Sequence, residues 1–185
     1  ERVAADGTVV EPLNDDAVVE ITTKLTEKKI EAVGVCLLWS IVNPVHERRV
    51  GQLLDRHLPG VPYTLSHELN PSLREYRRAS STCIDASLKP LMSGYLHNLS
   101  QRLQDAGFCG RLLVVTAQGG ALDAKDVARA PIHSIKSGPA MAPVAGRHYA
   151  RVELESEAVI VADTGGTSYD VSLVRGARIP WTRET

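Results

Sequence analysis

The chain has 185 residues, of which 43% are hydrophobic, 23% charged and 4% aromatic, and its formal net charge is −1. This balance gives no electrostatic support for binding nucleic acid or an anionic membrane, so we expect neither partner. No apolar run reaches the roughly 18–20 residues that span a bilayer, and an odd, unpatterned set of cysteines indicates reduced thiols. These features together predict a cytoplasmic protein.

The first part of the chain predicts a β-α-β unit. Asn14 and the two acids after it favour a helix start, and apolar residues at helical spacing extend that helix to about Lys29. The apolar run 32–39 is typical of a buried parallel strand. Asn43-Pro44 opens a second helix, and a short strand over 63–66 follows it.

The second part alternates helices and strands. Residues 71–106 are predicted to be helical with one break, because Pro90 either kinks a long helix or starts a new one. Further patterns predict a strand at 111–116, a short helix at 123–128, a helix from Met141 to about Tyr149, and a terminal hairpin. This alternation indicates an α/β class with a mainly parallel sheet and flanking helices.

Residues 163–170 carry the clearest chemical pattern. An acid ends an apolar strand, two glycines make a turn, and hydroxyls and a second acid follow. Glycines let the backbone approach a ligand closely, N–H groups and hydroxyls hold phosphate oxygens, and acids hold hydrated Mg²⁺. Taken alone, the segment is equally compatible with a simple β-hairpin turn, because Gly-Gly hairpins are common.

Two further glycine loops border core elements. Gln118-Gly119-Gly120 follows an apolar strand, where α/β sheets bind ligands. Ser137-Gly138-Pro139-Ala140 leads into a helix whose free N–H groups attract anions. Each loop alone is more often a structural turn, but three such loops together favour a phosphate site.

Other reactive side chains give weaker patterns. The six histidines show neither HxxxH nor HExxH spacing, so we expect surface or capping roles rather than a metal site. Glu75 and the neighbouring arginines, including Arg78, predict a solvated charged helix face with i,i+3 and i,i+4 pairs. The alternative is an arginine that faces an anionic substrate.

Several segments together resemble the hydantoinase/5-oxoprolinase family, the HyuA-type subunits. The likeness covers essentially the whole chain with the motifs in the family's order, and it indicates a central fragment that includes the start of the hydantoinase A domain. The residues that carry it are the run 32–39 with Asn43-Pro44-x-His46-Glu47, Ser66-His67-Glu68, Arg74-Glu75-Tyr76-x-Arg78-x-Ser80, Gly119-Gly120, Ser137-Gly138-Pro139-Ala140 and residues 163–172.

The resemblance implies a truncated ribonuclease-H-like unit of the actin, Hsp70 and sugar-kinase type. It assigns residues 1–68 to the C-terminal part of the family's N-terminal region. Residues 69–185 become a helical connection and the start of the hydantoinase A domain with its phosphate loop. ATP and Mg²⁺ are the implied cofactors of the intact protein.

The resemblance also implies roles for individual residues. Asp163 would hold Mg²⁺ through water, and Asp170 would orient a nucleophile or brace the turn. Glu75 and Arg78 would contact the substrate. The implied cofactor-binding residues are Gly165, Gly166, Thr167, Ser168, Ser137, Gly138, Gly119 and Gly120.

Three functions compete. Family members open cyclic amides such as 5-oxoproline with ATP, which implies an ATP-dependent cyclic-amide hydrolase with a HyuB-type partner subunit or fused domain. The alternative is a subunit of an acetone- or acetophenone-type carboxylase. Because the chain lacks the family's other Asp-x-Gly-Gly-Thr loop, we expect this segment alone to be an inactive module that binds neither ATP nor Mg²⁺.

Overall fold

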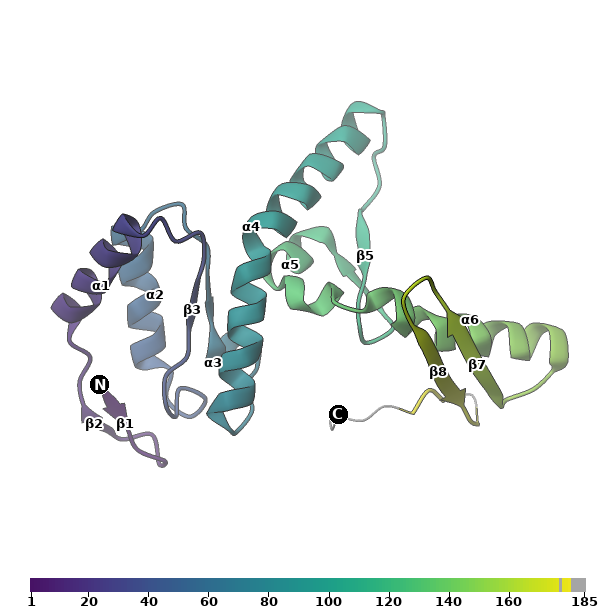
Figure 1. Ribbon diagram of the computed structural model, residues 1–185, viewed down its shortest axis with the longest axis horizontal. Coiled ribbons are helices and arrows are strands. Elements are labelled where there is room, and N and C mark those ends of the chain that lie inside the picture. The colour runs from purple at the N-terminus through teal and green to yellow at the C-terminus, as the bar shows by residue number, and fades with distance from the viewer. Residues whose placement is uncertain (177, 181–185) are drawn as a thin grey trace. The chain divides into compact units, whose positions relative to one another are not determined.

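The computed structural model describes residues 1–176 and 178–180, and the chain divides into two compact units (Figure 1). Unit 1 contains residues 1–109 and 128–132. Unit 2 contains residues 110–127 and the chain from residue 133 onward. This division rests on contacts within the chain, so the family-based boundary between residues 68 and 69 stays a prediction.

Unit 1 holds a β-α-β unit, as the sequence predicts. Asn14 caps α1 by accepting a hydrogen bond from the Ala17 amide at 3.0 Å. β3 and β4 pair in parallel across α2, with Val35 opposite Leu65. The elements are β1 (Arg2–Val3), β2 (Val9–Glu11), α1 (Asp15–Glu27), β3 (Val33–Val35), α2 (Val45–His57), β4 (Tyr63–Leu65), α3 (Ser66–Leu69) and α4 (Glu75–Asp105).

The core of unit 1 lies between the parallel strands and the α2 helix. Val35, Leu54, Leu58 and Leu65 are buried and pack against one another. Burial of such side chains contributes about 1.5–3 kcal/mol each, which makes this cluster the main apolar support of the unit.

α4 crosses the other side of the strand pair as one helix with Pro90 inside it. Of the two alternatives at this proline, one long helix or a new helix start, the structure has the long helix. Gly34 of β3 lies directly against α4, since a Cβ at this position would be in van der Waals contact with the Cys83 backbone at 3.5 Å.

Unit 2 is built from two hairpins around a long helix. α5 and the short 3-10 helix η1 cross the boundary between the units. The elements are β5 (Leu113–Val115), β6 (Ala121–Asp123), α5 (Ala124–Arg129), η1 (Pro131–Ser134), α6 (Ser137–Leu154), β7 (Val159–Thr164) and β8 (Tyr169–Val174).

The expected mainly parallel sheet is wrong for the described residues, although the α/β class holds. β3–β4 is the one parallel pair there, and β1–β2, β5–β6 and β7–β8 are separate antiparallel pairs. The physical reason is connection length, because a short turn joins only antiparallel strands and a parallel pair needs a long crossover. The predicted strand 32–39 is also shorter, because β3 ends at Val35, and Trp39 lies outside the β region with φ of +56°.

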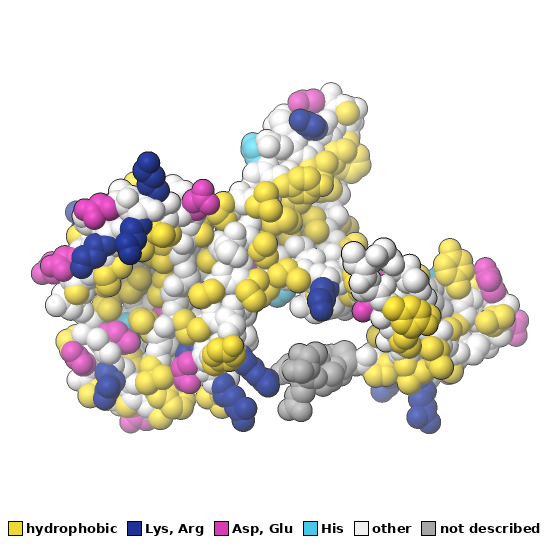
Figure 2. All heavy atoms as spheres, in the orientation of Figure 1, with side chains coloured by type: hydrophobic (Ala, Val, Ile, Leu, Met, Phe, Trp, Pro, Cys, Tyr) yellow, Lys and Arg dark blue, Asp and Glu magenta, His cyan; other side chains and the backbone are white. Residues whose placement is uncertain are grey.

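The β7–β8 hairpin has one apolar face exposed to solvent. Ile160 is opposite Leu173 in the strand register, and Ala162 is opposite Val171. Ile160 is 71% exposed and Val171 62% exposed, and Figure 2 shows hydrophobic side chains on this surface. Among the described residues, no helix combines the length and the apolar character needed to cross a membrane.

Candidate functional site

The turn at 165–168 joins β7 to β8 and lies in solvent. The Gly165 amide donates to the Ser168 carbonyl at 3.0 Å and closes the turn. The Ser168 hydroxyl donates to Asp170 Oδ2 at 3.0 Å. Gly165, Gly166, Thr167 and Ser168 are all exposed, and a Cβ at Gly166 would meet no atom within 4 Å. The hairpin reading of the sequence is therefore correct, and the turn has the open space that a phosphate group needs.

The two acids of this hairpin lie opposite each other. Asp163 pairs with Asp170 in the strand register, so both carboxylates belong to the same face as Val161. That face is turned toward α6, because a Cβ at Gly146 would collide with Val161. Like charges directly opposite each other destabilise a strand pair, and a cation between them would remove that cost. This donor set fits a hydrated Mg²⁺.

The 118–120 loop is the turn of the β5–β6 hairpin. The Thr116 amide donates to the Gly120 carbonyl at 2.9 Å, and the Gly119 amide donates to the Thr116 carbonyl at 3.0 Å. Gly119 has φ of +77°, a conformation that favours glycine. A Cβ there would lie 3.3 Å from Val144 and 3.6 Å from the Ala140 carbonyl, so the turn lies directly against α6.

The third predicted loop is the start of α6. Lys136 has a left-handed conformation with φ of +56°, and the helix begins at Ser137 without a side-chain cap. Its first N–H groups point out of the helix end, and a Cβ at Gly138 would meet no atom within 4 Å. Because the Gly119 turn lies against α6 and β7 and β8 also pack on it, this one helix is shared by all three predicted glycine loops.

A second polar cluster lies in unit 1, and Arg78 is the one member of it that was predicted as a site residue. The Glu47 side chain is fully buried, and its Oε1 accepts hydrogen bonds from the Leu37 amide at 2.8 Å and the Ser66 hydroxyl at 2.6 Å. Its Oε2 accepts from the His67 amide at 3.1 Å and lies 2.7 Å from His67 Nδ1. We call Glu47, Ser66, His67 and Arg78 the buried cluster.

Arg78 is also fully buried, which corrects the prediction of a solvated charged face at this position. Its Nε donates to Ser66 Oγ at 3.0 Å, Nη1 to the Ser72 carbonyl at 3.2 Å, and Nη2 to the Leu37 carbonyl at 2.7 Å. Glu75, by contrast, is exposed at the start of α4. The burial follows from position, since α4 packs this helix face onto β3 and β4.

The environment of Glu47 favours its charged form. Burial acts against ionisation, but hydrogen bonds from Ser66, His67 and the Leu37 amide outweigh it and lower the pKa of Glu47 below its usual value of 4.5. A carboxylate can therefore remain charged inside unit 1 without a directly bonded arginine.

One nitrogen of the buried cluster has no partner. His67 Nε2 is buried and makes no hydrogen bond, and the nearest acidic oxygen, Glu68 Oε1, lies 3.8 Å away. The described residues contain no group of three or more His, Cys, Asp or Glu side chains placed to hold a metal ion.

The sequence did contain a signal for the buried cluster. Its charged members come from three separate motifs, 43–47, 66–68 and 74–80, each of which was singled out for its residue types. Two of these motifs follow the apolar strands β3 and β4, and the carboxyl ends of parallel strands lie at the same edge of a sheet. The sequence did not show that the three motifs lie together in the fold.

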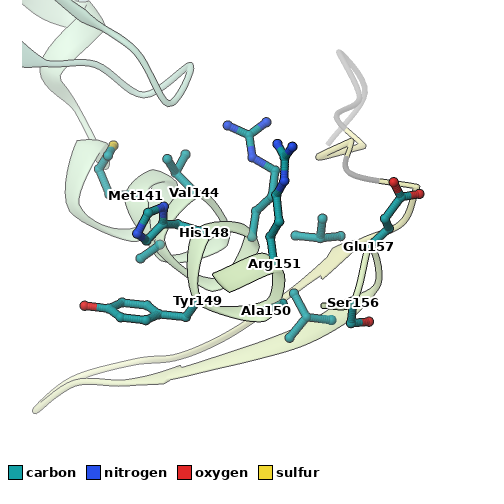
Figure 3. Close-up of a pocket in the computed structure, with 12 residues that line it drawn as sticks. Met141, Val144, His148, Tyr149, Ala150, Arg151, Ser156 and Glu157 are labelled. Carbon is teal, nitrogen blue, oxygen red and sulfur yellow. The ribbon is translucent and has the colours of Figure 1, made fainter. Parts of the chain in front are cut away.

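A cavity of about 690 Å³ lies beside α6 in unit 2 (Figure 3). Met141, Val144, His148 and Arg151 line it from the helix, and Glu157 lines it from the connection to β7. None of the predicted site residues lines this cavity, so its chemistry is separate from that of the glycine loops.

Two protein-family models match the chain. A model described as hydantoinase/oxoprolinase matches residues 78–185, and a model described as the hydantoinase/oxoprolinase N-terminal region matches residues 1–58. The buried cluster draws residues from both matched regions.

Curated relatives match the chain along nearly its whole length. The caprolactamase subunit alpha of Pseudomonas jessenii is 31% identical over 184 residues, which are 100% of this chain and 26% of the relative. The acetophenone carboxylase gamma subunit of Aromatoleum aromaticum is 31% identical over 179 residues, which are 94% of this chain and 24% of the relative. The chain thus spans about a quarter of the length of the curated relatives it matches.

Solved structures share the fold. The crystal structure of ATP-dependent caprolactamase from Pseudomonas jessenii matches with a TM-score of 0.83 and 31% identity, over 93% of this chain and 25% of that one. A nucleotide-free structure of acetone carboxylase matches with a TM-score of 0.80 and 26% identity, over 95% of this chain and 25% of that one.

Proposed function

Since this chain belongs to the hydantoinase/oxoprolinase family, we propose that it is a segment of an ATP-dependent enzyme that opens small cyclic amides. The observation that carries the proposal is the match to ATP-dependent caprolactamase over 93% of the chain at a TM-score of 0.83. Caprolactam and 5-oxoproline are both cyclic amides, so the names of the family and of this relative indicate one substrate class.

Ring opening of an amide needs activation because the amide carbon is a poor electrophile. Transfer of the γ-phosphoryl group of ATP to the amide oxygen would make the amide carbon a better electrophile. Water would then attack this carbon, the ring C–N bond would break with a proton from that water passing to nitrogen, and a second water would hydrolyse the resulting acyl phosphate to the ring-opened amino acid and inorganic phosphate. The protein contributes mainly by positioning the reactants and by stabilising the charge that develops on the phosphoryl oxygens.

We assign the phosphate-binding role to the glycine loops on α6. Gly165, Gly166, Thr167 and Ser168 would contact the β- and γ-phosphates from the exposed turn. Asp163 would hold Mg²⁺ through water, and Asp170, which already accepts from Ser168, would brace the turn or orient a nucleophile. The facing carboxylates at 163 and 170 support a cation at this position.

The other two loops would complete the phosphate site. Gly119 and Gly120 form a tight turn against α6, and Ser137 and Gly138 form the start of the same helix. Their shared support by one helix favours a common role, since a rigid element holds ligand-binding groups more precisely than independent loops.

The two proposed substrate contacts are not equally supported. Glu75 is exposed, so a substrate can reach its carboxylate. The three guanidinium nitrogens of Arg78 all donate to protein acceptors. Arg78 would therefore act by holding the 66–72 segment in place around the substrate.

The proposal is tested by measuring ADP release from ATP by the full-length protein with 5-oxoproline, N-methylhydantoin and caprolactam. We expect at least one cyclic amide to stimulate ADP release above the rate with ATP alone. Absence of stimulation by every cyclic amide would reject the proposal.

A second function has its own support. The 31% identity to the acetophenone carboxylase gamma subunit favours a parent in which ATP activates a ketone for carboxylation. In that case acetone or acetophenone would stimulate ATP turnover, and bicarbonate would be required. Turnover that is indifferent to bicarbonate would reject this candidate.

The segment alone is proposed to be inactive. The relatives are named as subunits, which supports a partner of the HyuB type, either separate or fused. Calorimetry with Mg-ATP on the 185-residue chain tests whether the segment suffices for binding. We expect no submillimolar binding, and a submillimolar dissociation constant would show that the missing loop is dispensable.

A further inference from the structure

The cavity beside α6 combines charged side chains with an apolar wall, and all of its lining residues belong to unit 2. Its volume of about 690 Å³ falls within the roughly 300–1,000 Å³ of pockets that hold small molecules. Two arginines, one glutamate and three valines are among the side chains that line it: Arg147, Arg151, Glu157, Val144, Val159 and Val174. Unit 2 by itself therefore contains a space that fits a small ligand.

The two arginines of the cavity have no counter-ion among the described residues. They lie four residues apart on α6, so their positive charges share one face of the helix and repel each other. Both side chains are exposed, and no described side chain forms an ion pair or a hydrogen bond with Arg147 or Arg151. A carboxylate bound by them would offset this repulsion, because a guanidinium group can hold a carboxylate through two parallel N–H bonds.

Glu157 supplies the opposite charge from a different element. It lies in the connection between α6 and β7, and Figure 3 shows that its side chain and that of Arg151 extend from two separate parts of the cavity lining. The Glu157 carboxylate forms no ion pair or hydrogen bond with another described residue, so it does not neutralise the arginines. The cavity thus offers one partner to an anionic group, another to a cationic group, and an apolar surface to a carbon chain that joins them.

We propose that this cavity binds an ω-amino acid, which is an alkyl chain with a carboxylate at one end and an ammonium group at the other. The carboxylate would contact Arg147 and Arg151, the ammonium group would contact Glu157, and the chain would lie against the valines. The inference rests on the proposed function, because opening a lactam such as caprolactam produces a carboxylate and an amine on one carbon chain. The cavity would therefore be a product site.

The charges of the cavity favour such a product over the lactam from which it forms. A lactam is neutral, so it makes no charge-assisted pair with a guanidinium or a carboxylate, whereas ring opening creates both of the charges that these groups bind. None of the residues proposed to bind phosphate lines the cavity. A product held there would therefore leave the glycine loops free for nucleotide.

Calorimetry on the 185-residue chain with four matched probes tests this inference. The probe 6-aminohexanoate carries both charges, hexanoate and hexylamine carry one each, and caprolactam carries none. We expect 6-aminohexanoate to bind at least about tenfold more tightly than each of the other three, because each of them lacks at least one charge-assisted contact. Binding of any other probe as tight as that of 6-aminohexanoate, or no binding of 6-aminohexanoate, would overturn the inference.

Two variants assign the two ends of the ligand. Arg151→Gln should weaken binding of 6-aminohexanoate and of hexanoate, each by about tenfold or more. Glu157→Gln should weaken binding of 6-aminohexanoate by a similar factor and change that of hexanoate by less than about threefold. Circular dichroism confirms that each variant is folded.

Glu153→Gln is the matched control, because Glu153 is exposed on the same helix and does not line the cavity. We expect it to change the affinity for 6-aminohexanoate by less than about twofold. Wild-type affinity in Arg151→Gln and Glu157→Gln, or an equal loss in Glu153→Gln, would overturn the assignment of the site to this cavity.

These measurements are independent of turnover, so they separate the inference from the proposed function. Amide-stimulated ADP release by the full-length protein, with no binding of 6-aminohexanoate, would overturn the site and leave the proposed function intact. Binding of 6-aminohexanoate with no ADP release for any cyclic amide would support the amino-acid site and reject its role as a product site.

Discussion

The buried cluster of unit 1 and the 163–170 turn of unit 2 use the same residue types in opposite ways. In unit 1, the charged groups of Glu47 and Arg78 are fully buried and hydrogen-bonded to protein atoms. His67 Nε2, in the same cluster, is buried without a hydrogen-bond partner. In unit 2, two carboxylates and two glycines lie around an exposed turn with few internal bonds. The first arrangement bonds its charges within its own unit, and the second leaves its turn residues open to solvent.

The largest expected effect comes from Arg78→Ala, which breaks the buried cluster. The change leaves three oxygen atoms without their guanidinium donor, namely Ser66 Oγ and the Ser72 and Leu37 carbonyls, so the free energy of unfolding should fall by about 3–5 kcal/mol. Urea unfolding measures this loss of unfolding free energy. Arg77→Ala, on the exposed neighbour, should change stability by less than about 0.5 kcal/mol. A loss below about 1 kcal/mol for Arg78→Ala would contradict the structural role of the cluster.

Glu47→Gln should cost about 1.5–3 kcal/mol at neutral pH, because a neutral amide replaces a charged acceptor of several hydrogen bonds. The folded-state pKa of Glu47 lies below the unfolded value of 4.5. Its stabilisation is therefore complete above about pH 4.5 and is lost as pH falls through the folded pKa. Unfolding measured from pH 7 to pH 3 should show the two curves converging, and parallel curves would refute this assignment.

Gly119→Ala tests whether the 118–120 turn lies against α6. The left-handed backbone at φ of +77° and the Val144 side chain 3.3 Å from a Cβ should together cost about 1–2 kcal/mol. Gly138→Ala is the matched control, since its Cβ would meet nothing within 4 Å. Thermal unfolding compares them, and equal stability of the two variants would mean that Gly119 has no such constraint.

The smallest effect is expected for Asp170→Asn in the exposed turn. Removing one of two facing carboxylates should stabilise the hairpin by about 0.2–1 kcal/mol, and the gain should shrink at high salt. The Asn carbonyl can keep the bond from Ser168. In the full-length protein the same variant should weaken Mg-ATP binding, measured by calorimetry. Unchanged nucleotide binding would remove Asp170 from the phosphate site.

The sequence correctly predicted those helices and strands whose signals lie within a few neighbouring residues. Asn14 caps the helix it was expected to cap, and the strand–glycine–strand pattern at 159–174 forms the expected hairpin. Pro90 left two alternatives open, a long helix or a new helix start, and packing of α4 on the strands favours the long helix despite the local cost of a proline. The parallel-sheet prediction failed where turns of a few residues fixed the pairing.

Local sequence patterns could not predict which polar groups are buried. Arg78 reads as one of several helix-surface arginines, and nothing in its spacing separates it from Arg77. Only the packing of α4 against β3 and β4 distinguishes the buried residue from the exposed one. The same holds for His67, whose pairing with Glu47 joins residues 20 positions apart.

Product analysis by the full-length protein tests the central claim most directly. The protein is incubated with ATP, Mg²⁺ and a cyclic amide in the absence of bicarbonate, and ADP and the ring-opened amino acid are quantified by mass spectrometry. The account predicts a ring-opened acid formed together with ADP. A carboxylated ketone formed only with bicarbonate, and no ring-opened acid from any cyclic amide, would contradict it.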